Sequence, residues 1–405
     1  MFVTSAAAFA FANVNPTNYI GGVSFLPERD IPDLSGKIIL ESIRQILQHN
    51  PEHVFLAARS EGKAKDAIAD LEAAAPNKKS KLTWLPLDLS STKSVQDAAE
   101  SFKNQASRLD VLLLNAGVMS LPPGETDLGH EIQLGTNHTG HFLLANLLLP
   151  VLLKTAEEPG SDVRVVSLSS VGHNLAPGFE SILDQDKLKK CNTHSRYGAS
   201  KAANILFAAE LARRHPSLTA VSVHPGVIAT DLYGAVQEGN PLAGLGVKFL
   251  GSIGTKVDQG AWNQLWAAVG AKKEQLINGA YYVPVGNGKP HNQYVTSKEM
   301  GQRLWEWSEA ELKKGGKENF FDRVLQRPAS QGAEVARRAS DASDKERPEG
   351  LQLERPASHG ETEIKGSGPQ TLRRQRRSSR LQRLKDYMHS EQEYDEVGDM
   401  YARLM

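Results

Sequence analysis

A tyrosine and a lysine four residues apart, Tyr197 and Lys201, form the pair in this sequence best suited to proton transfer. They lie in 196–204, where small residues and a following amphipathic run predict a helix. Side chains four positions apart share one face of a helix, so the ammonium would lie beside the phenol. A nearby positive charge favours the phenolate and lowers the phenol pKa from its usual ~10. Tyr197 is therefore a candidate general acid or base near neutral pH.

A second pair with the same spacing, Tyr294 and Lys298, shows that spacing alone is not specific. Two apolar segments, 111–114 and 163–167, precede Tyr197, and each is followed by small or hydroxylated residues. This pattern indicates buried parallel strands that end at an active-site edge. Tyr294 is not preceded by a strand that ends in serines, so the context favours Tyr197.

Three motifs follow one another in a fixed order along the chain. They are Asn115-Ala116-Gly117 after one strand, Ser169-Ser170 at the end of the next, and the Tyr197-x-x-x-Lys201 helix. In these motifs and their order, residues 30–320 resemble the short-chain dehydrogenases/reductases. The long interval between Ser170 and Tyr197, with the insertion 175–195, is similar to the retinol-dehydrogenase-like and WW-domain-oxidoreductase-like branch, where this loop borders the substrate.

The resemblance implies hydride transfer between a hydrophobic carbonyl compound and its alcohol. Tyr197 would protonate the substrate oxygen, while Lys201 would lower the tyrosine pKa and bind the nicotinamide ribose. Ser170 would donate a hydrogen bond to the substrate oxygen, with Ser169 as the alternative because the strand end is uncertain by one residue. Asn137 matches the fourth catalytic position, whose backbone orders a relay water. A helix-interior asparagine that bonds only locally is the alternative.

The resemblance also implies a nicotinamide cofactor. An acidic residue at the end of the second strand hydrogen-bonds the ribose 2′-hydroxyl of NAD, whereas an arginine there binds the 2′-phosphate of NADP. Arg59 stands there, which favours NADP(H), and a surface arginine without this role is the alternative. The implied cofactor contacts are Arg59, Asp88, Asn115, Ala116, Gly117, Tyr197, Lys201, Pro225, Gly226, Ile228 and Thr230.

One family motif is missing. The family carries Thr-Gly-x-x-x-Gly-x-Gly after the first strand, where backbone amides and a helix N-terminus hold the pyrophosphate. Here Leu40 is followed directly by Glu41, and no glycine lies between Gly36 and Gly62. Apolar residues even share one helical face over 37–49, which would also suit a single helix. The alternative to an active enzyme is therefore a catalytically impaired protein of the same fold that cannot bind the pyrophosphate.

The order of predicted elements indicates an α/β fold. Apolar, β-type segments at 53–60, 82–88, 111–114, 163–167, 220–224 and 280–285 alternate with helical patterns. This alternation predicts a Rossmann-type, doubly wound parallel sheet in a single domain, 31–322. Residues 1–30 are predicted to form an N-terminal arm. Residues 323–405 are polar and of low complexity, which predicts a disordered tail.

Composition excludes several classes of function. Lys plus Arg and Asp plus Glu both number 47, so net charge does not favour nucleic acid or an acidic membrane. The single cysteine, Cys191, excludes an internal disulfide. The longest apolar run, 142–153, is too short to span a bilayer, and 6–12 lack a basic flank for a signal peptide. We expect a cytoplasmic protein with a small-molecule substrate, and an oligomer is compatible with the sequence.

A metal site is not expected. His138 and His141 have His-x-x-His spacing, but no cysteine or acidic residue completes a recognised ligand pattern. Packing within a helix is the interpretation that the sequence favours for both histidines.

Overall fold

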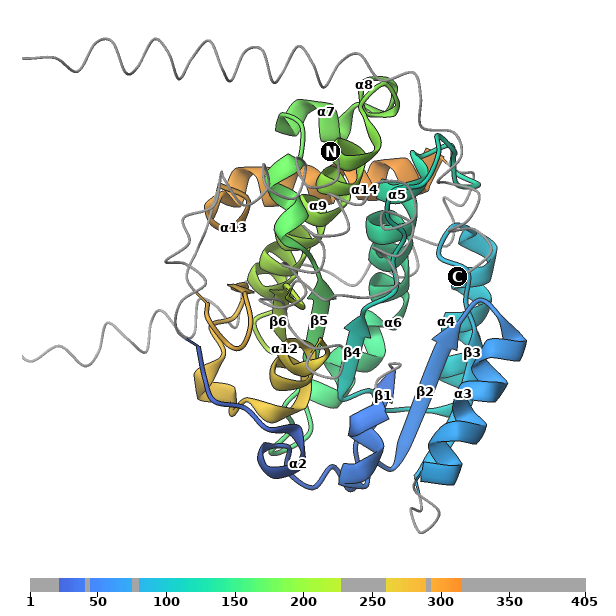
Figure 1. The fold of residues 1–405 in the computed structure, drawn as a ribbon, viewed down its shortest axis with the longest axis vertical. Helices are drawn as coiled ribbons and strands as arrows, with labels where there is room; N and C mark the ends of the chain where they lie inside the picture. The colour runs from blue at the N-terminus through green and yellow to red at the C-terminus, as the bar shows by residue number, and fades with distance from the viewer. Residues whose placement is uncertain (1–21, 41–43, 75–79, 227–259, 289–292, 315–405) are drawn as a thin grey trace, which may run out of the picture. The chain divides into compact units, whose positions relative to one another are not determined.

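Seven strands form one parallel sheet in the order β3-β2-β1-β4-β5-β6-β7 (Figure 1). The computed structural model describes residues 22–40, 44–74, 80–226, 260–288 and 293–314. The strands are β1 (Ile38–Leu40), β2 (His53–Ala58), β3 (Lys81–Pro86), β4 (Val111–Leu114), β5 (Arg164–Leu168), β6 (Thr219–Val223) and β7 (Tyr281–Tyr282). The strand order reverses between β1 and β4, which creates a crevice at the carboxyl ends of these strands. The predicted doubly wound α/β fold is confirmed.

Helices cover both faces of the sheet (Figure 1). The longer ones are α3 (Glu61–Ala74), α4 (Thr92–Gln105), α6 (His141–Ala156), α9 (Thr193–Arg214) and α14 (Lys298–Lys314). The shorter ones are α2 (Pro27–Asp30), η2 (Arg44–His49), α5 (Ile132–Leu134), η3 (Gly135–Gly140), η4 (Val171–Leu175), α7 (Phe179–Leu183), α8 (Gln185–Lys189), α12 (Trp262–Leu265), η7 (Trp266–Gly270), η8 (Lys273–Gln275) and α13 (Gln293–Thr296).

Successive strand residues enter two different hydrophobic cores. On β4, Leu112 and Leu114 pack with side chains from α4, α6 and α9, whereas Val111 and Leu113 pack with side chains from η2 and η7. Neighbouring side chains on a strand point to opposite faces, so both faces of this sheet must be apolar. This explains why the strands appear in the sequence as continuous apolar runs.

The first crossover is short. Ile38, Ile39 and Leu40 pair with β2, and β1 also pairs with β4, so the alternative of one helix over 37–49 is wrong. Pairing on both sides of β1 overrides the helical spacing of its apolar residues. After β1, only the six-residue 3-10 helix η2 is described before β2 begins at His53. The point of the expected deletion, 41–43, lies outside the described residues.

A continuous helix over Ile132–Ala156 runs through the centre of the domain. It comprises α5, the π-helix η3 and α6, and its length and composition would suffice to cross a membrane. However, 72% of its most apolar window is buried inside the protein, as in the core helix of a globular domain. It carries Pro150 and packs against α4, which agrees with the expected core helix at 142–153.

The chain before β1 packs partly on the domain. Phe25 and Ile31 are buried, and the Val23 amide donates to the Val285 carbonyl at 2.8 Å. The rest of the predicted arm, 1–21, and the predicted tail, 323–405, lie outside the described residues.

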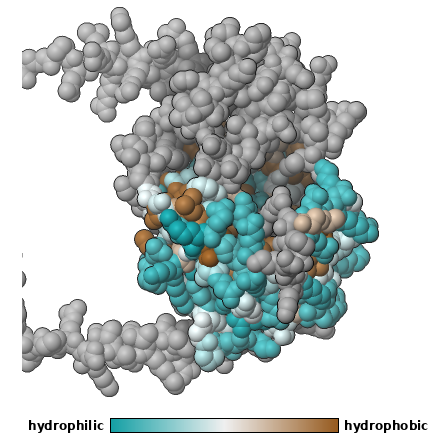
Figure 2. All heavy atoms as spheres, turned by 60° about the horizontal axis from the view of Figure 1, so that its bottom comes forward, coloured by the Kyte–Doolittle hydropathy of each residue, from teal (hydrophilic) through white to brown (hydrophobic). Residues whose placement is uncertain are grey.

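Few large apolar side chains are exposed in the described part of the chain. Figure 2 shows a face that is mainly hydrophilic, with hydrophobic residues scattered between polar ones. Among the described residues, Val23, Leu26 and Ile277 are the exposed large hydrophobic side chains. Isolated exposed apolar residues of this kind are usual on globular proteins.

We expect Gly140→Ala to destabilise the domain. A Cβ at this buried position in η3 would lie 2.3 Å from the Leu89 carbonyl oxygen, so backbone would have to move. Such overpacking typically costs about 1–3 kcal/mol. Gly62→Ala in α3 is the control, because no heavy atom lies within 4 Å of the added Cβ. Helix propensity should make it neutral or stabilising by up to about 1 kcal/mol. Chemical denaturation of both variants tests this, and equal stabilities would contradict the expectation.

Candidate active site

The sheet brings most of the predicted site residues to one edge. Asn115 directly follows β4, Ser170 lies just after β5, and Pro225 lies just after β6. Arg59 follows β2, and Asp88 comes shortly after β3. Because all pairs of neighbouring strands are parallel, these residues share the carboxyl edge where ligands bind in such folds.

Helix α9 carries Tyr197 and Lys201 to this edge. Lys201 is 3% exposed, and its ammonium donates to the Leu168 carbonyl oxygen at the end of β5, at 3.1 Å. Its Nζ lies 5.6 Å from the centroid of the Tyr197 ring. Burial lowers the pKa of Lys201 to about 8, because an ammonium is poorly solvated there. Lysine and tyrosine therefore lie together, as their spacing predicted.

The two serines after β5 have different surroundings. Ser169 is buried, and its hydroxyl donates to the Lys201 carbonyl at 2.7 Å, which ties α9 to the strand end. Ser170 is half-buried, and its Oγ accepts a hydrogen bond from the Gly172 amide at 3.1 Å. An oxygen that accepts from an amide keeps its own hydrogen for another acceptor. Ser170 is thus oriented as a donor, whereas Ser169 already donates to the backbone.

Ser170 and Tyr197 meet across Gly172. A Cβ at Gly172 would lie 2.8 Å from Tyr197 Cε1 and 3.4 Å from Ser170 Oγ. Behind them, the buried His173 ring donates from Nδ1 to the Ser170 carbonyl at 2.5 Å. The glycine therefore permits the close approach of ring and hydroxyl, and the histidine fixes the backbone of the serine.

Asn137 lies in the π-helix η3, a helix type that often occurs at functional sites. Its side-chain Oδ1 accepts from the Val118 amide at 2.7 Å, and Nδ2 donates to the Val118 carbonyl and to Ser200 Oγ. Its backbone carbonyl accepts from His141 Nδ1 at 2.9 Å. The asparagine thus fixes the loop after β4, and its carbonyl has a histidine as a partner.

Asn204 lies beside Lys201 at the candidate site, but it was not among the site residues predicted from the sequence. Its Nδ2 donates to the Leu168 carbonyl at 2.9 Å, the oxygen that also binds Lys201. Asn204 lies one helical turn after Lys201 on the same face of α9, and this spacing is the signal that could have identified it. The shared carbonyl was not predictable, because it comes from β5.

The two histidines of η3 and α6 have separate partners. His138 Nε2 bonds Ser308 Oγ of α14 at 2.9 Å, while His141 bonds its own helix. Burial lowers the pKa of His138 to about 3 and that of His141 to about 4, so both are neutral at pH 7. In the described part of the chain, no group of three His, Cys, Asp or Glu side chains could hold a metal ion.

The loop 115–121 after β4 suits the nicotinamide end of a dinucleotide. A Cβ at Gly117 would lie 3.0 Å from Asn137 Oδ1 and 3.5 Å from Lys201 Nζ, so the glycine keeps the space beside both groups open. Asn115 is half-buried and Ala116 is exposed at this edge. These residues fit a ribose and its amide-bearing ring at this end.

Further cofactor contacts implied by the family are placed as follows. Arg59 is exposed at the end of β2, and Asp88 Oδ1 accepts from the amide and hydroxyl of Ser90. Pro225 and Gly226 follow β6, and Gly226 has a φ of 99°, which favours glycine. Ile228 and Thr230 lie outside the described residues.

The pyrophosphate part of a dinucleotide does not fit the described residues. The binding motif requires glycines that let backbone amides approach the phosphates and a long helix aimed at them. After β1 the next described element is the six-residue η2, and the sequence between Gly36 and Gly62 has no glycine. In the described part of the chain, the candidate nicotinamide end therefore stands without a glycine-rich phosphate cradle.

Known proteins with similar sequences indicate one family. The family profile described as short chain dehydrogenase matches residues 40–179. A short-chain dehydrogenase/reductase of Armillaria gallica is 37% identical over 299 residues, which cover 70% of this chain and 93% of the relative. Human polyprenol dehydrogenase is 35% identical, covering 62% of this chain and 75% of the relative.

A solved structure also shares the fold. A protein of Mycobacterium paratuberculosis, described as uncharacterised, superimposes with a TM-score of 0.52 at 26% identity. The match covers 72% of this chain and 98% of the other.

We expect Lys201→Met to increase stability at pH 7 while it removes the ammonium from the site. The folded pKa of about 8 lies below the ordinary 10.5, so the unfolded chain binds the proton more tightly. Stability of the unchanged protein should therefore rise from pH 8 to 10.5, and the advantage of the variant should shrink over this window. At pH 7 the advantage should not exceed about 3 kcal/mol, because the variant also loses a hydrogen bond.

Thermal melts between pH 6 and 10 measure this difference. Lys103→Met, at an exposed position, controls for loss of one positive charge. A Lys201→Met protein that is less stable than the unchanged chain at pH 7 would show that the buried ammonium is stabilising overall.

Proposed function

The chain belongs to the short-chain dehydrogenases/reductases, and from this premise we propose that it interconverts a hydrophobic carbonyl compound and its alcohol. The observation that carries this proposal is the grouping of Tyr197, Lys201 and Ser170 at the carboxyl edge of the sheet. Lys201 is held at β5 by the Leu168 carbonyl, and the Tyr197 ring and Ser170 hydroxyl both lie against Gly172. This grouping suits proton transfer to an oxygen atom.

Each side chain has a separate task in the proposed reaction. A nicotinamide cofactor, which Lys201 and the loop 115–121 would hold, would supply the hydride chemistry at the substrate carbon. In the reductive direction, the Tyr197 hydroxyl gives its proton to the substrate oxygen. The Lys201 ammonium stabilises the resulting phenolate, and it is mainly charged below pH 8, since its pKa is about 8. The Ser170 hydroxyl donates to the same substrate oxygen and stabilises its developing charge.

We assign NADP(H) as the cofactor. Arg59 is exposed at the end of β2, where its guanidinium is available to a ribose 2′-phosphate. Arginine binds phosphate through a planar, charged donor set that neutral residues do not supply. The similarity to human polyprenol dehydrogenase, whose name denotes a long apolar alcohol, supports a hydrophobic substrate. The proposed setting is the cytoplasm.

A second candidate follows from the first crossover. The described residues around β1 and η2 supply no glycine-rich turn for the pyrophosphate. The chain would then be an impaired member of the family that keeps its proton-transfer residues but binds the dinucleotide weakly. Cofactor affinity separates the two candidates.

Tyr197→Phe should abolish carbonyl reduction, because phenylalanine retains the ring but has no proton to donate. Tyr294→Phe is the matched control: Tyr294 belongs to the second Tyr-x-x-x-Lys, is 6% exposed, and its hydroxyl is 3.4 Å from the Pro177 carbonyl. That variant should keep activity within a few-fold. NADPH-dependent reduction of an apolar aldehyde or ketone panel provides the measurement. Equal losses in both variants would rule out the assignment of Tyr197.

Insertion of a Thr-Gly-x-x-x-Gly-x-Gly turn between Leu40 and Glu41 should strengthen NADPH binding. The unchanged chain holds the two ends of the cofactor but lacks the amides that bind the pyrophosphate. Hydrogen bonds to charged groups contribute about 1.5–3 kcal/mol each, so two or three of them correspond to several powers of ten in Kd. Titration by NADPH fluorescence or calorimetry compares the two chains. Affinities within a few-fold of each other would refute the impaired-binding candidate.

A further inference from the structure

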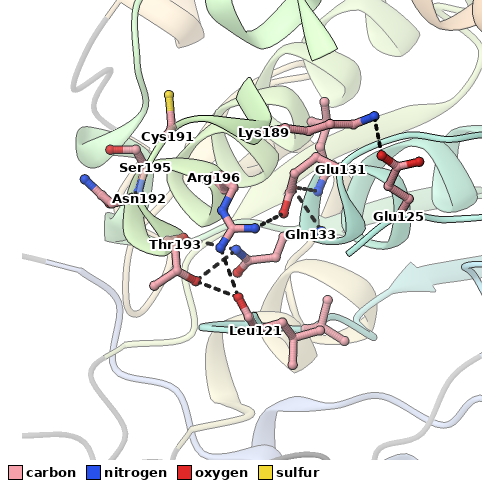
Figure 3. A network of polar contacts seen from close by, with 12 residues as sticks. Leu121, Glu125, Glu131, Gln133, Lys189, Cys191, Asn192, Thr193, Ser195 and Arg196 are labelled. Atoms are coloured by element: carbon pink, nitrogen blue, oxygen red, sulfur yellow. Dashed lines mark hydrogen bonds and ion pairs between the residues drawn. The ribbon is translucent and has the colours of Figure 1, made fainter. Parts of the chain in front are cut away.

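A buried ion pair lies immediately before the catalytic tyrosine. Arg196 is 3% exposed, and its NH1 lies 3.2 Å from Oε1 of Glu131, which is 0% exposed. The other terminal nitrogen, NH2, donates to the Leu121 carbonyl at 3.1 Å (Figure 3). One guanidinium thus joins the first turn of α9 to the start of α5 and to the end of the loop after β4.

Glu131 connects this pair to the helix that carries Asn137. Its second carboxylate oxygen accepts from the amides of Gln133 and Leu134, at 3.0 and 2.8 Å, and so caps α5. Helix α5 continues without a break into the π-helix that holds Asn137. The Glu131 amide also donates to Gln185 of α8, in the insertion 175–195. The carboxylate therefore fixes the start of one site helix to the arginine of another.

The far end of the loop 115–121 is bonded to the same two helices. Leu121 O also accepts from Thr193 Oγ1 at 3.1 Å (Figure 3). The Ser120 amide donates to Gln133 Oε1 at 3.0 Å. Gln133 Nε2 in turn donates to the Thr193 carbonyl. Ser120 has a φ of 58°, a left-handed conformation that costs energy for a residue other than glycine. These bonds hold the loop in that conformation.

The near end of this loop lies against the reacting groups. Gly117 lies beside Asn137 Oδ1 and Lys201 Nζ, and Val118 bonds the Asn137 side chain through both its amide and its carbonyl. A shift of Leu121 or Ser120 would therefore move the backbone that lies next to the catalytic lysine. Small displacements of a bound reactant can lower rates by about a hundredfold.

We propose that Arg196 and Glu131 are positioning residues that hold the loop 115–121 in register with Tyr197 and Lys201. The pair acts through this loop, on which the nicotinamide end of the cofactor would lie, and touches no substrate itself. Burying both charges removes them from water, so such a pair is weak evidence for a purely stabilising role. The expected effect of the pair on the reaction rate rests on the proposed function. Its expected effect on the loop 115–121 does not, because that effect needs no turnover.

Arg164 offers a matched control at the opposite edge of the sheet. It is 5% exposed, pairs with Asp162, and donates to the carbonyls of Ala267 and Ala271 at 3.0 and 2.6 Å. It begins β5, whereas the catalytic groups lie beyond its end. Arg164→Met and Arg196→Met thus each remove a buried guanidinium, its ion pair and one or two carbonyl bonds, although Asp162 is 27% exposed and Glu131 is 0% exposed. Only Arg196 lies at the active-site edge.

The test combines hydrogen exchange with kinetics on the full chain. In Arg196→Met, amide exchange across 118–121 should accelerate by about tenfold or more, because the loop loses the bond from Arg196 to the Leu121 carbonyl. The kcat for NADPH-dependent reduction should fall about ten- to a hundredfold. Arg196→Lys, which keeps the charge and one donor, should recover part of both losses. Arg164→Met should lower the melting temperature while it leaves exchange at 118–121 and kcat within about twofold.

Two outcomes would overturn the proposal. One is exchange at 118–121 that rises equally in both Arg→Met variants, which would make the pair an ordinary structural contact. The other is faster loop exchange in Arg196→Met with unchanged kcat, which would show that the loop position does not matter for the reaction. If the unchanged chain shows no turnover, the proposed function fails, and the exchange comparison alone decides whether the pair holds the loop.

Discussion

The site depends on one hydrogen bond between a buried ammonium and a strand end. Lys201 Nζ donates to the Leu168 carbonyl, and Ser169 returns a bond from its hydroxyl to the Lys201 carbonyl. These two bonds fix α9 against β5, so that Tyr197 and Ser170 lie on the same edge. The ammonium is costly to bury, as its lowered pKa shows, and the polar groups around it partly replace its lost hydration.

Two parts of the candidate site lie on different elements of the sheet. The candidate proton-transfer groups are brought together by β4, β5 and α9, whose side chains are largely buried. The phosphate cradle belongs to the β1 crossover, where only η2 is described before β2. Because β1 pairs with both β2 and β4, the sheet keeps its order despite this short connection. The fold therefore does not require the glycine-rich turn, although tight binding of a dinucleotide would.

The polar network around Arg196 joins segments that are far apart in the sequence and border the candidate site. Its members come from the loop after β4, from α5, from the insertion 175–195 and from α9 (Figure 3). Side-chain bonds to backbone atoms dominate this network, so its geometry follows from the path of the main chain. Glu131, for example, is also the N-cap of α5.

The sequence by itself determined the fold class, the family and the pairing of Tyr197 with Lys201, because these follow from strand alternation and helical spacing, which are local. It left Ser169 and Ser170 open, and it could not identify Asn204 or the Arg196–Glu131 pair. These contacts join segments that are far apart in the chain. Which atoms come into contact depends on how α9 packs against the end of β5. The same holds for β1, where local helical periodicity was overridden by strand pairing on both sides. Tertiary contacts decide these structures because a buried polar group or strand edge needs a hydrogen-bond partner, and that partner can come from any part of the chain.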